Sequence, residues 1–422
     1  LLSCSQITIL GNNITGYLEH SIFVSNSYKI SVSHNIFDNN RGMDVKTSNY
    51  TLISYNDFIF NDYGIHFVEC VHSTVLNNIF NYSVAYGALE FYSSINNTVA
   101  NNFGYNSYAL LKGSTDVLFL YDCALNLVVN NSFAGGYYGI NLQECLNNII
   151  MDNNLYNNIG GISITDSICS IINNSVAYNT REAIKIDSKP PFFPSDPVYS
   201  TLVQTNDFIG NNLTGSSQAS ASGSNHTFIH NYWSDWTSPD TNADGIVDNA
   251  YIISHNSDIN DLFPYVSPNH PSSHYLFNFQ LLYPLGGKTL SKGGQIQIQW
   301  TPANDSLGHS VMYKVYYSET YELWPGITNW VLLAENVNTA SYDWDTSTVG
   351  EGAYITYDFV TEGPFFWIKV IALCSENPLV QISSNIVQIT LTDTLKIDWS
   401  GWIFTLPLTL VFLVFLKKRR RK

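Results

Sequence analysis

The segment NYWSDWTSPDTNADGIVDNAYI (residues 231–252) combines closely spaced oxygen donors with a central glycine. The donors fall at positions 1, 3, 5, 7 and 9 of a calcium-loop spacing, with a backbone carbonyl expected at position 7. These residues are Asp240, Asn242, Asp244, Ile246 and Asp248. Calcium is a hard cation that accepts about six to eight oxygen ligands without strict angles, and Gly245 permits the sharp turn. The spacing therefore predicts a calcium site.

This loop differs from a helix-loop-helix calcium sensor in two respects. Position 12 is Tyr251 rather than a bidentate glutamate, and no helical period flanks the loop. We therefore expect a structural clamp, completed by Asp258 or Asp261. The alternative is a turn rich in Asp and Asn whose side chains bond their own backbone and need no metal.

A second set of residues has the chemistry of sugar cleavage. Glycoside hydrolases hold two carboxylates about 5–5.5 Å apart for retention and about 6.5–9.5 Å apart for inversion. If successive turns of the chain lie about 4.8 Å apart, Glu144 with Asp166, or Asp166 with Asp187, can meet either distance. Arg181 is the candidate base for a lyase. An enzyme therefore stays open as an alternative to a binding protein.

The elements that position these residues follow from an internal repeat, because an Asn-x-apolar tripeptide recurs about every 22 residues. The tripeptides begin at residues 12, 35, 56, 78, 101, 131, 153 and 174. Asn tolerates the backbone of a tight corner, and its amide can bond the Asn of the next turn. The glycines that come later in each repeat, at Gly42, Gly64, Gly87, Gly139 and Gly161, are expected at the next corner for the same backbone reason.

Two apolar residues at alternate positions follow six of these eight tripeptides, and the repeat near Leu110 fits less well. The pairs are Met43/Val45, Ile65/Phe67, Leu89/Phe91, Ile140/Leu142, Ile162/Ile164 and Ile184/Ile186. Alternation over so few residues indicates short strands, and no window has a helical period. Near Leu110 the second apolar position holds Lys112, and a spacing of 30 residues marks an insertion. Short strands stacked at this interval predict an all-β chain that begins with a parallel β-helix over residues 1–266.

The residue between the two apolar positions points outward, because side chains alternate along a strand. The outward residues form a stripe of Asp44, His66, Glu90, Leu111, Asn141, Ser163 and Lys185. Carboxylates and amides suit the hydroxyls of sugars, and rings such as Tyr92 beyond the pairs suit their apolar faces. We predict that this stripe binds carbohydrate. The alternative is that an outer face is polar only because it meets water.

The repeats resemble those of right-handed β-helices of the pectate-lyase-like superfamily. The stretch HNYWSDWTSPDTNADGIVDNAYII resembles the sequence that closes the β-helix in the periplasmic copper-binding NosD family and in related carbohydrate-binding and sugar-hydrolase domains. The resemblance implies that Tyr232, Trp233 and Trp236 cap the last rung. The sequence lacks the hydrolase signatures NTD, DD and GHG of the superfamily.

Copper handling, which the NosD resemblance implies, finds less support in the residues. Copper prefers clustered Met, Cys and His, whereas the chain has three Met, and His66 and His72 are the one close histidine pair of the repeats. The six cysteines have no C-x-x-C spacing, so the sequence indicates no zinc or redox site. Most are expected as small buried apolar residues, and a pairing of Cys145 with Cys169 stays open.

A second module is predicted after a Pro/Ser/His-rich linker at 267–275. Over residues 276–394 Asn becomes rarer and longer alternating strands appear, such as QIQIQW and YKVYYS. Their spacing predicts a β-sandwich. The stretches IQWTPANDSLGHSVMYKVYYS and SYDWDTS resemble fibronectin type III modules, with Trp300 as the core tryptophan. Such modules usually act as spacers or binding units.

The C-terminus predicts a membrane anchor. The apolar residues 399–416 are about long enough for one transmembrane helix, and the basic residues 417–422 would then lie in the cytoplasm. The remaining chain holds 12 Lys or Arg against 34 Asp or Glu, which disfavours nucleic acid as a partner. The chain begins with Leu, and we expect a preceding signal peptide to have been removed. These features predict a cell-surface protein with one membrane span that binds extracellular carbohydrate or another polymer.

Overall fold

The structure is a computed structural model. It describes residues 1–16, 21–38, 40–59, 61–81, 87–105, 116–189, 198–212, 217–223, 225–253, 259–269, 276–277, 279–285, 288–321, 327–328, 330–350, 352–357, 360–376, 381–383 and 387–393. The expected linker residues 270–275, the Pro-rich residues 190–197, Asp258, Leu111, the expected membrane span 399–416 and the basic tail 417–422 lie outside these residues. Within the described residues, no helix has the length and apolarity to cross a bilayer.

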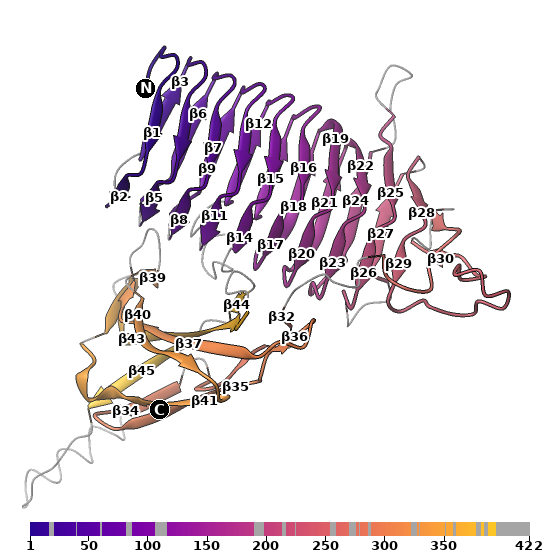
Figure 1. Ribbon diagram of the computed structural model, residues 1–422. Helices are drawn as coiled ribbons and strands as arrows, with labels where there is room; N and C mark the ends of the chain where they lie inside the picture. Colours follow the sequence, from indigo (N-terminus) through magenta and orange to yellow (C-terminus); the bar gives the residue numbers. More distant parts are fainter. Residues whose placement is uncertain are drawn as a thin grey trace, which may run out of the picture.

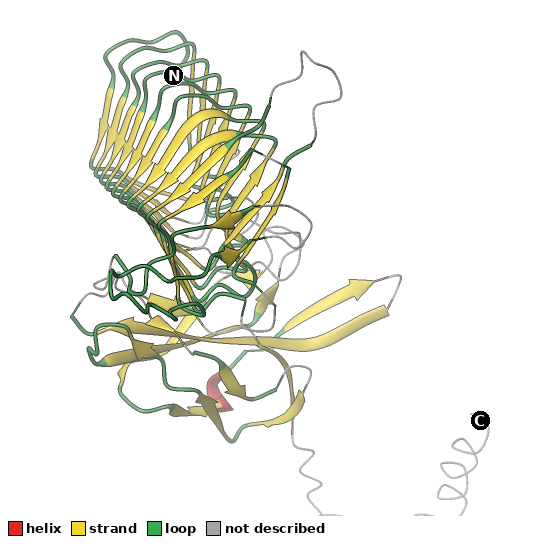
Figure 2. Ribbon diagram, turned by 90° about the vertical axis from the view of Figure 1, so that its right-hand side faces the viewer, coloured by secondary structure: helices red, strands yellow, loops and turns green. Residues whose placement is uncertain are grey.

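The first part of the chain is a parallel β-solenoid of the right-handed type, built from three sheets that stack one rung upon the next (Figure 1). Figure 2 looks along the stack, where the rungs nest behind one another. We call the three sheets A, B and C. Parallel pairing in all three confirms the β-helix predicted from the repeat.

The strands of each sheet follow in spatial order. Sheet A holds β3 (Ile22–Ser25), β6 (Met43–Lys46), β9 (Ile65–Val68), β12 (Leu89–Tyr92), β15 (Leu118–Tyr121), β18 (Tyr138–Gln143), β21 (Gly160–Thr165), β24 (Ile184–Asp187) and β27 (Ala219–Ser222). Sheet B holds β1 (Thr8–Leu10), β4 (Ser31–Ser33), β7 (Leu52–Ser54), β10 (Thr74–Leu76), β13 (Thr98–Ala100), β16 (Leu127–Val129), β19 (Leu146–Met151), β22 (Ile168–Ile172), β25 (Thr201–Gln204), β28 (Thr227–Ile229), β31 (Asn260–Asp261) and β30 (Tyr251–Ile252). Sheet C holds β2 (Asn13–Thr15), β5 (Ile36–Asp38), β8 (Asp57–Ile59), β11 (Ile79–Asn81), β14 (Phe103–Tyr105), β17 (Ser132–Ala134), β20 (Asn154–Tyr156), β23 (Ser175–Ala177), β26 (Asp207–Ile209) and β29 (Tyr232–Trp233).

One asparagine per rung forms a continuous hydrogen-bonded ladder between sheets B and C. In each pair of neighbouring rungs, the backbone N–H and the side-chain amide of one Asn both donate to Oδ1 of the next. The ladder runs through Asn12, Asn35, Asn56, Asn78, Asn102, Asn131, Asn153, Asn174, Asn206 and Asn231. Buried amides that are fully bonded in this way fix the register of the rungs.

The structure corrects two details of the corner prediction. The left-handed backbone belongs to the residue before each ladder Asn, such as Tyr55 and Asn130. In the rung whose tripeptide begins at Asn101, the ladder residue is Asn102. Of the five corner glycines, Gly42 has a positive φ, of +94°. Gly161 is instead required by close approach, because a Cβ there would lie 2.3 Å from the carbonyl oxygen of Ala183.

The predicted apolar pairs are all buried in one core. Phenylalanine rings stack between rungs within it, as in Phe37–Phe58 and Phe58–Phe80, whose centroids are 4.6 and 4.9 Å apart. All six cysteines are free, and five of them are buried. The pairing of Cys145 with Cys169 is therefore not present.

The rung predicted near Leu110 lies later in the chain. The structure places that rung at β15, where Leu118 and Leu120 point inward. Phe119, not Leu111, is therefore the outward residue of this rung. The 30-residue spacing reflects an insertion before the strand, as predicted, but the sequence put the strand on the wrong side of it.

The second module has two sheets around a shared core. Its larger sheet contains β34 (Lys288–Lys292), β45 (Val387–Asp393), β43 (Val360–Cys374), β37 (Val311–Ser318) and β40 (Val331–Val337), with β42 (Ala353–Tyr357) and β44 (Gln381–Ser383) beside β43; the smaller contains β33 (Leu281–Tyr283), β35 (Gln295–Trp300) and β41 (Ser341–Asp345). The short strands are β32 (Leu276–Phe277) with β36 (Asn304–Asp305), and β38 (Thr320–Tyr321) with β39 (Ile327–Thr328). Trp300 is buried in this core, next to Tyr313. A single 3-10 turn, η1 (Thr346–Thr348), is the helical element of the described residues. The likeness to fibronectin type III modules stays a prediction.

The second module lies against the outer face of sheet C (Figure 1). Ile371 of β43 is buried in one cluster with residues of that face, including Phe103 and Tyr156. Gln381 donates to Asn81 at 3.1 Å, and Asn157 donates to the carbonyl of Leu276. The module is thus packed along the β-helix rather than held away from it as a separate stalk.

Lys369 should make the stability of the second module depend on pH. It is buried on the same face of β43 as Ile371, with Nζ 4.2 Å from the ring centre of Trp330, and burial lowers its pKa to about 7. In the unfolded chain this lysine stays protonated up to about pH 10.5. Between pH 7 and pH 10.5 the unfolded chain therefore binds more protons than the folded chain. Stability should therefore rise from pH 7 to pH 10 and be lowest below pH 7. Thermal melts should show this rise shrinking in Lys369→Met but not in Lys314→Met; equal pH dependence in wild type and Lys369→Met would contradict it.

Candidate functional site

The predicted stripe forms one row along the outer face of sheet A. Cα partners in the parallel strands place its members side by side on successive rungs, in the order Phe23, Asp44, His66, Glu90, Phe119, Asn141, Ser163, Lys185 and Ser220. The row brings together all six described residues that the sequence assigned to ligand binding. Phe23, Phe119 and Ser220 are additions, because their strands fell outside the apolar pairs recognised in the sequence.

At one end of the row, two basic residues hold a carboxylate. Asp44 is 1% exposed, and its two oxygens lie 3.0 Å from His66 Nδ1 and 3.0 Å from Lys46 Nζ. Burial alone would raise the pKa of Asp44, but the hydrogen bonds and charges of His66 and Lys46 outweigh it and lower that pKa. Asp44 therefore stays ionised and orients the imidazole of His66 through Nδ1.

Further along the row, two acidic residues are arranged differently. Glu90 accepts a hydrogen bond from the backbone of Gly87, and burial raises its pKa. Asp116, at the start of the next rung, accepts from the side chain of Asn141 at 2.7 Å and from the backbone of Tyr138 at 3.0 Å. Burial is the main cause that raises the pKa of Asp116 to about 6, and the charge of Glu90 contributes to the same rise. Burial therefore favours the protonated form of both carboxyl groups.

Aromatic rings border the polar row. The centroid of His66 lies 5.9 Å from that of Tyr63 and 5.2 Å from that of Tyr92, and Tyr92 is also 5.7 Å from Phe119. Tyr121, 36% exposed, extends this group to the next rung, 6.1 Å from Tyr92. The face thus offers ring surfaces beside hydrogen-bonding side chains, which is the combination that sugars require.

The residues predicted for catalysis are held in ion pairs or on corners. Lys189 contacts Asp166 with its ammonium at 2.7 Å and its backbone at 2.8 Å; burial raises the pKa of Asp166, but these contacts lower it overall. Asp187 pairs with Lys185 at 2.6 Å. Glu144 sits beside Tyr121 and raises the pKa of its hydroxyl, mainly through a hydrogen bond. On the face of sheet A, burial instead raises the pKa values of Glu90 and Asp116, of which the sequence missed Asp116.

Two further predicted groups have separate partners. Arg181 donates to the hydroxyl of Tyr137 at 2.9 Å, at an exposed corner. His72 lies 2.8 Å from the amide of Asn96 and stacks on Tyr50, whereas His66 belongs to the row on sheet A. His66 and His72 thus serve different contacts.

The predicted calcium loop forms an exposed turn after β29. Asp240 accepts from the backbone N–H groups of Asp244 and Gly245 at 3.2 and 3.1 Å, and Asp244 accepts from Ile246 at 2.9 Å. Asn242 donates to Asp244, and Asp248 accepts from the backbone and hydroxyl of Thr241. These are the local bonds of an Asp- and Asn-rich turn, the metal-free alternative to the predicted calcium site.

Asp261 does not complete that loop, in contrast to the sequence prediction. It is fully buried at the end of the asparagine ladder, where Oδ2 accepts from the backbone and side chain of Asn231, both at 2.9 Å. The same oxygen accepts from Trp233 at 3.2 Å, and Oδ1 accepts from His230 and Phe263. An acceptor-only carboxylate fits here because, among the described strands, no further rung of the ladder follows.

The aromatic cap lies where the resemblance implied. Trp233 is fully buried; its ring is tilted against Phe208 and stacks on Tyr251, with centroids 4.4 and 4.0 Å apart. Trp236 packs against the same core and donates to the carbonyl of Asn249. Tyr251, at position 12 of the calcium spacing, therefore closes the core instead of binding metal.

Comparison with known proteins gives one family match. Residues 1–95 match the model of the periplasmic copper-binding protein (NosD) family. This match covers part of the β-helix and agrees with the fold. No curated protein matches the chain significantly.

Several solved structures resemble the chain at low identity. The enzymatically active domain of tailspike protein 2 from bacteriophage CBA120 matches at 11% identity and a TM-score of 0.38, over 87% of this chain and 66% of that one. PfbA, a surface adhesin of Streptococcus pneumoniae, matches at 12% identity and a TM-score of 0.38, over 53% of this chain and 78% of that one. Full-length tailspike protein 2 of an Escherichia coli O157:H7 bacteriophage matches at 11% identity and a TM-score of 0.37, over 91% of this chain and 64% of that one. The chain thus covers less than two thirds of the length of both tailspike chains.

Proposed function

We propose that the outer face of sheet A binds an extended carbohydrate, or a polymer of similar chemistry, outside the cell. The observation that carries this proposal is the in-register row of hydrogen-bonding side chains from Asp44 to Lys185, bordered by the rings of Tyr92, Phe119 and Tyr121. Rungs of a parallel sheet repeat about every 4.8 Å, so the face offers a regular series of contacts to a repeating ligand.

The contacts divide into two kinds. The rings stack on the apolar faces of the sugars, and the edges of the sugars bond to the amide of Asn141, the hydroxyl of Ser163 and the imidazole of His66. The ammonium of Lys185 is a donor and the hydroxyl of Ser163 is both donor and acceptor, so the face favours a ligand that carries both donors and acceptors. A neutral or mixed-charge polysaccharide meets these requirements better than a uniformly acidic one, because the chain as a whole is acidic.

Retention on immobilised polysaccharides tests this function. Removing Tyr92 and His66 together, as Tyr92→Ala with His66→Ala, should weaken binding about tenfold or more, since two contacts of about 1 kcal/mol each are lost. Tyr55→Asn is the matched control, because Tyr55 is 54% exposed at a corner away from the row and Asn accepts its left-handed backbone. Equal weakening by the control, or no binding to any polysaccharide of the panel, would contradict the proposal.

A sugar-cleaving enzyme is the second candidate, and Glu90 and Asp116 favour it. A carboxyl group whose pKa is raised to about 6 can act as a general acid near neutral pH, while a partner serves as base or nucleophile. The same polysaccharides should be assayed for new reducing ends and unsaturated products. Product formation that is lost in Asp116→Asn would favour the enzyme over the binding protein.

We also propose that calcium stabilises the turn at residues 240–248. Asp240, Asn242, Asp244 and Asp248 would supply side-chain oxygens and Ile246 a backbone carbonyl. Calcium should raise the melting temperature of the purified chain, and EGTA should lower it, with both effects absent in Asp244→Ala. Because binding at about 100 times Kd stabilises by about 2.7 kcal/mol, the expected shift is several degrees. A melting temperature that is the same in calcium and EGTA would leave only the metal-free turn.

We further propose that the chain is anchored at the cell surface through residues 399–416, with 417–422 in the cytoplasm. The sequence supports this placement through the apolar run and the basic residues that follow it. Protease added to intact cells should remove the β-helix and the second module. Full protection of both would contradict the topology.

A further inference from the structure

Three side chains of different kinds meet at one end of the second module. Asp305 ends the short strand β36, His309 lies four residues later in the loop before β37, and Cys374 ends β43. One ligand atom from each lies within 4.8 Å of the other two. In the described part of the chain, this is the one group of three His, Cys, Asp or Glu side chains whose ligand atoms lie this close together.

The distances within the cluster fit a tetrahedral metal. His309 Nδ1 lies 3.5 Å from Cys374 Sγ and 3.6 Å from Asp305 Oδ1. With Zn–S of about 2.3 Å and Zn–N or Zn–O of about 2.0 Å, a tetrahedral zinc ion holds N and S about 3.6 Å apart and N and O about 3.3 Å apart. These two distances are within a few tenths of an ångström of the zinc values, and the ligand atoms of Asp305 and Cys374 lie within 4.8 Å of each other, so the three side chains can approach one zinc ion.

The surroundings of the cluster resemble the outer shell of a metal site. The second ring nitrogen of His309, Nε2, lies 3.4 Å from Glu376, so the histidine can present Nδ1 to a metal while Nε2–H donates to a carboxylate. The backbone N–H of Glu376 donates to Cys374 Sγ at 3.4 Å, which favours a thiolate. The backbone of Leu307 donates to Asp305 at 2.8 Å and fixes that carboxylate.

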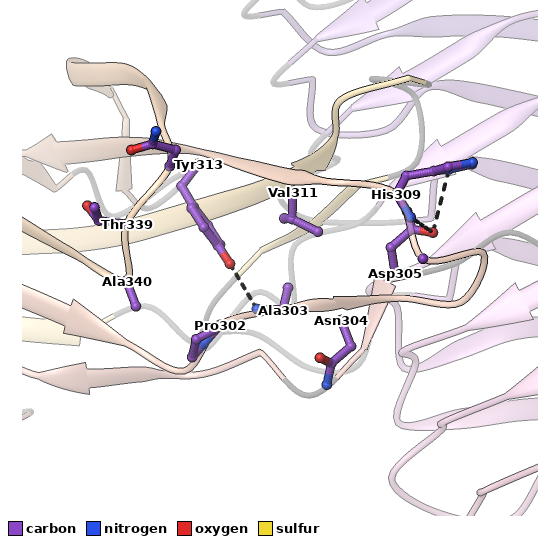
Figure 3. Close-up of a pocket in the computed structure, with 11 residues that line it drawn as sticks. Pro302, Ala303, Asn304, Asp305, His309, Val311, Tyr313, Thr339 and Ala340 are labelled. Atoms are coloured by element: carbon purple, nitrogen blue, oxygen red, sulfur yellow. Dashed lines mark hydrogen bonds and ion pairs between the residues drawn. The ribbon is translucent and has the colours of Figure 1, made fainter.

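The cluster combines burial with access from solvent. Cys374 and the side chain of Asp305 are fully buried, whereas the side chain of His309 is 25% exposed. Asp305 and His309 line a pocket of about 390 Å³ that extends past Val311 and Tyr313 to Ala340 (Figure 3). Figure 3 shows these two residues together at one end of that pocket.

We propose that Asp305, His309 and Cys374 bind one Zn²⁺ ion, with Glu376 orienting the histidine. One thiolate, one imidazole and one carboxylate suit zinc, which accepts all three ligand types. Three protein ligands leave a fourth position for water or a small ligand that enters through the pocket. The ion would fix the loop 305–309 to the end of β43, at the side of the module where β36 pairs with β32 and Asn157 of the β-helix contacts Leu276.

Sequence reasoning could not find this site. Cys374 lies 65 residues after His309, without a second cysteine nearby, so the spacing gives no zinc motif. Only the antiparallel pairing of β37 with β43, which sets Val311 opposite Cys374, brings the ligands together.

Cobalt(II) titration of the full chain, stripped of metal with a chelator, tests the site. One equivalent of Co²⁺ should produce a thiolate-to-cobalt charge-transfer band and the visible bands of a tetrahedral ion, and Zn²⁺ should displace both. Cys374→Ser should lose the charge-transfer band, while Cys4→Ser, which changes a partly exposed cysteine of the β-helix, should keep it. Glu376→Gln should keep the band but weaken Zn²⁺ binding about 10- to 100-fold.

His309→Gln provides a test that does not disturb the buried thiol. It should reduce Co²⁺ binding at least tenfold without changing the metal-free circular dichroism spectrum. No charge-transfer band at one equivalent, or a band that persists in both Cys374→Ser and His309→Gln, would overturn the proposal. A band lost in Cys4→Ser would place the cobalt in the β-helix and overturn it equally.

Discussion

Replacing Asn131 with Ala is expected to lower the melting temperature of the β-helix by roughly 6–15 °C. Asn131 is 1% exposed in the middle of the ladder, and its Oδ1 accepts both the backbone and the side-chain amide of Asn102 at 2.9 and 3.0 Å. Its own amide donates to the carbonyls of Val99 and Val129 and to Asn153. Each buried group left without a partner costs about 1–3 kcal/mol, so the expected loss is about 3–5 kcal/mol in all.

Asn130→Gly is the matched control for this substitution. Asn130 is the exposed neighbour of Asn131, with φ of +56°, and Gly keeps that conformation without strain. Within the described part of the chain, its side chain donates to Asn101 at the surface. The control should change the melting temperature by less than about 2 °C. Both substitutions are measured by circular dichroism melts and by urea unfolding. Equal effects of the two would show that the hydrogen bonds of the ladder do not stabilise the β-helix.

The end of the ladder should respond almost as strongly. Asp261→Asn is expected to destabilise the chain by about 2–4 kcal/mol, because one carboxylate oxygen becomes an NH₂ group that faces N–H donors. If the NH₂ takes the place of Oδ1, the backbone N–H groups of His230 and Phe263 lose their acceptor. If it takes the place of Oδ2, Asn231 and Trp233 lose theirs.

Asp248→Asn is the control for this change of one atom. It removes the same charge in the exposed turn, where Asp248 accepts from Thr241. In EGTA it should have little effect on the melting temperature, whereas Asp261→Asn should keep its full effect. A calcium-dependent loss in Asp261→Asn would instead favour Asp261 as a calcium ligand, and an unchanged melting temperature would contradict its place at the end of the ladder.

Much of the β-helix could be predicted because its physics is local and repeated. The alternation of Ile162 and Ile164 around Ser163 indicates which side chain points outward without any knowledge of distant contacts. The parallel register then brings Asp44 beside His66 and Ser163 beside Lys185, as the repeat implied. The row of the candidate site therefore follows from the sequence.

The remaining features depend on contacts that no short pattern encodes. Because of an insertion, the strand that contains Phe119 lies later in the chain than the repeat predicted, and Asp116 just before it was therefore missed. The partners Lys189 for Asp166 and Asn231 for Asp261 are 23 and 30 residues away, and they decide whether each carboxylate serves an ion pair or the ladder. The contact of Ile371 with sheet C joins parts of the chain more than 190 residues apart, so it appears only in three dimensions.

Hydroxyl-radical footprinting of the full chain, with and without a retained polysaccharide, tests the proposed binding face most directly. Tyrosine and histidine rings react with radicals in proportion to their exposure, so a bound polymer protects the rings it covers. Binding to sheet A predicts protection of His66, Tyr92 and Tyr121 and no change at Tyr50 and Tyr55, which are 47% and 54% exposed at the corners. Protection confined to Tyr50 and Tyr55, with the rings of sheet A unchanged, would contradict the proposal that this face is the binding surface.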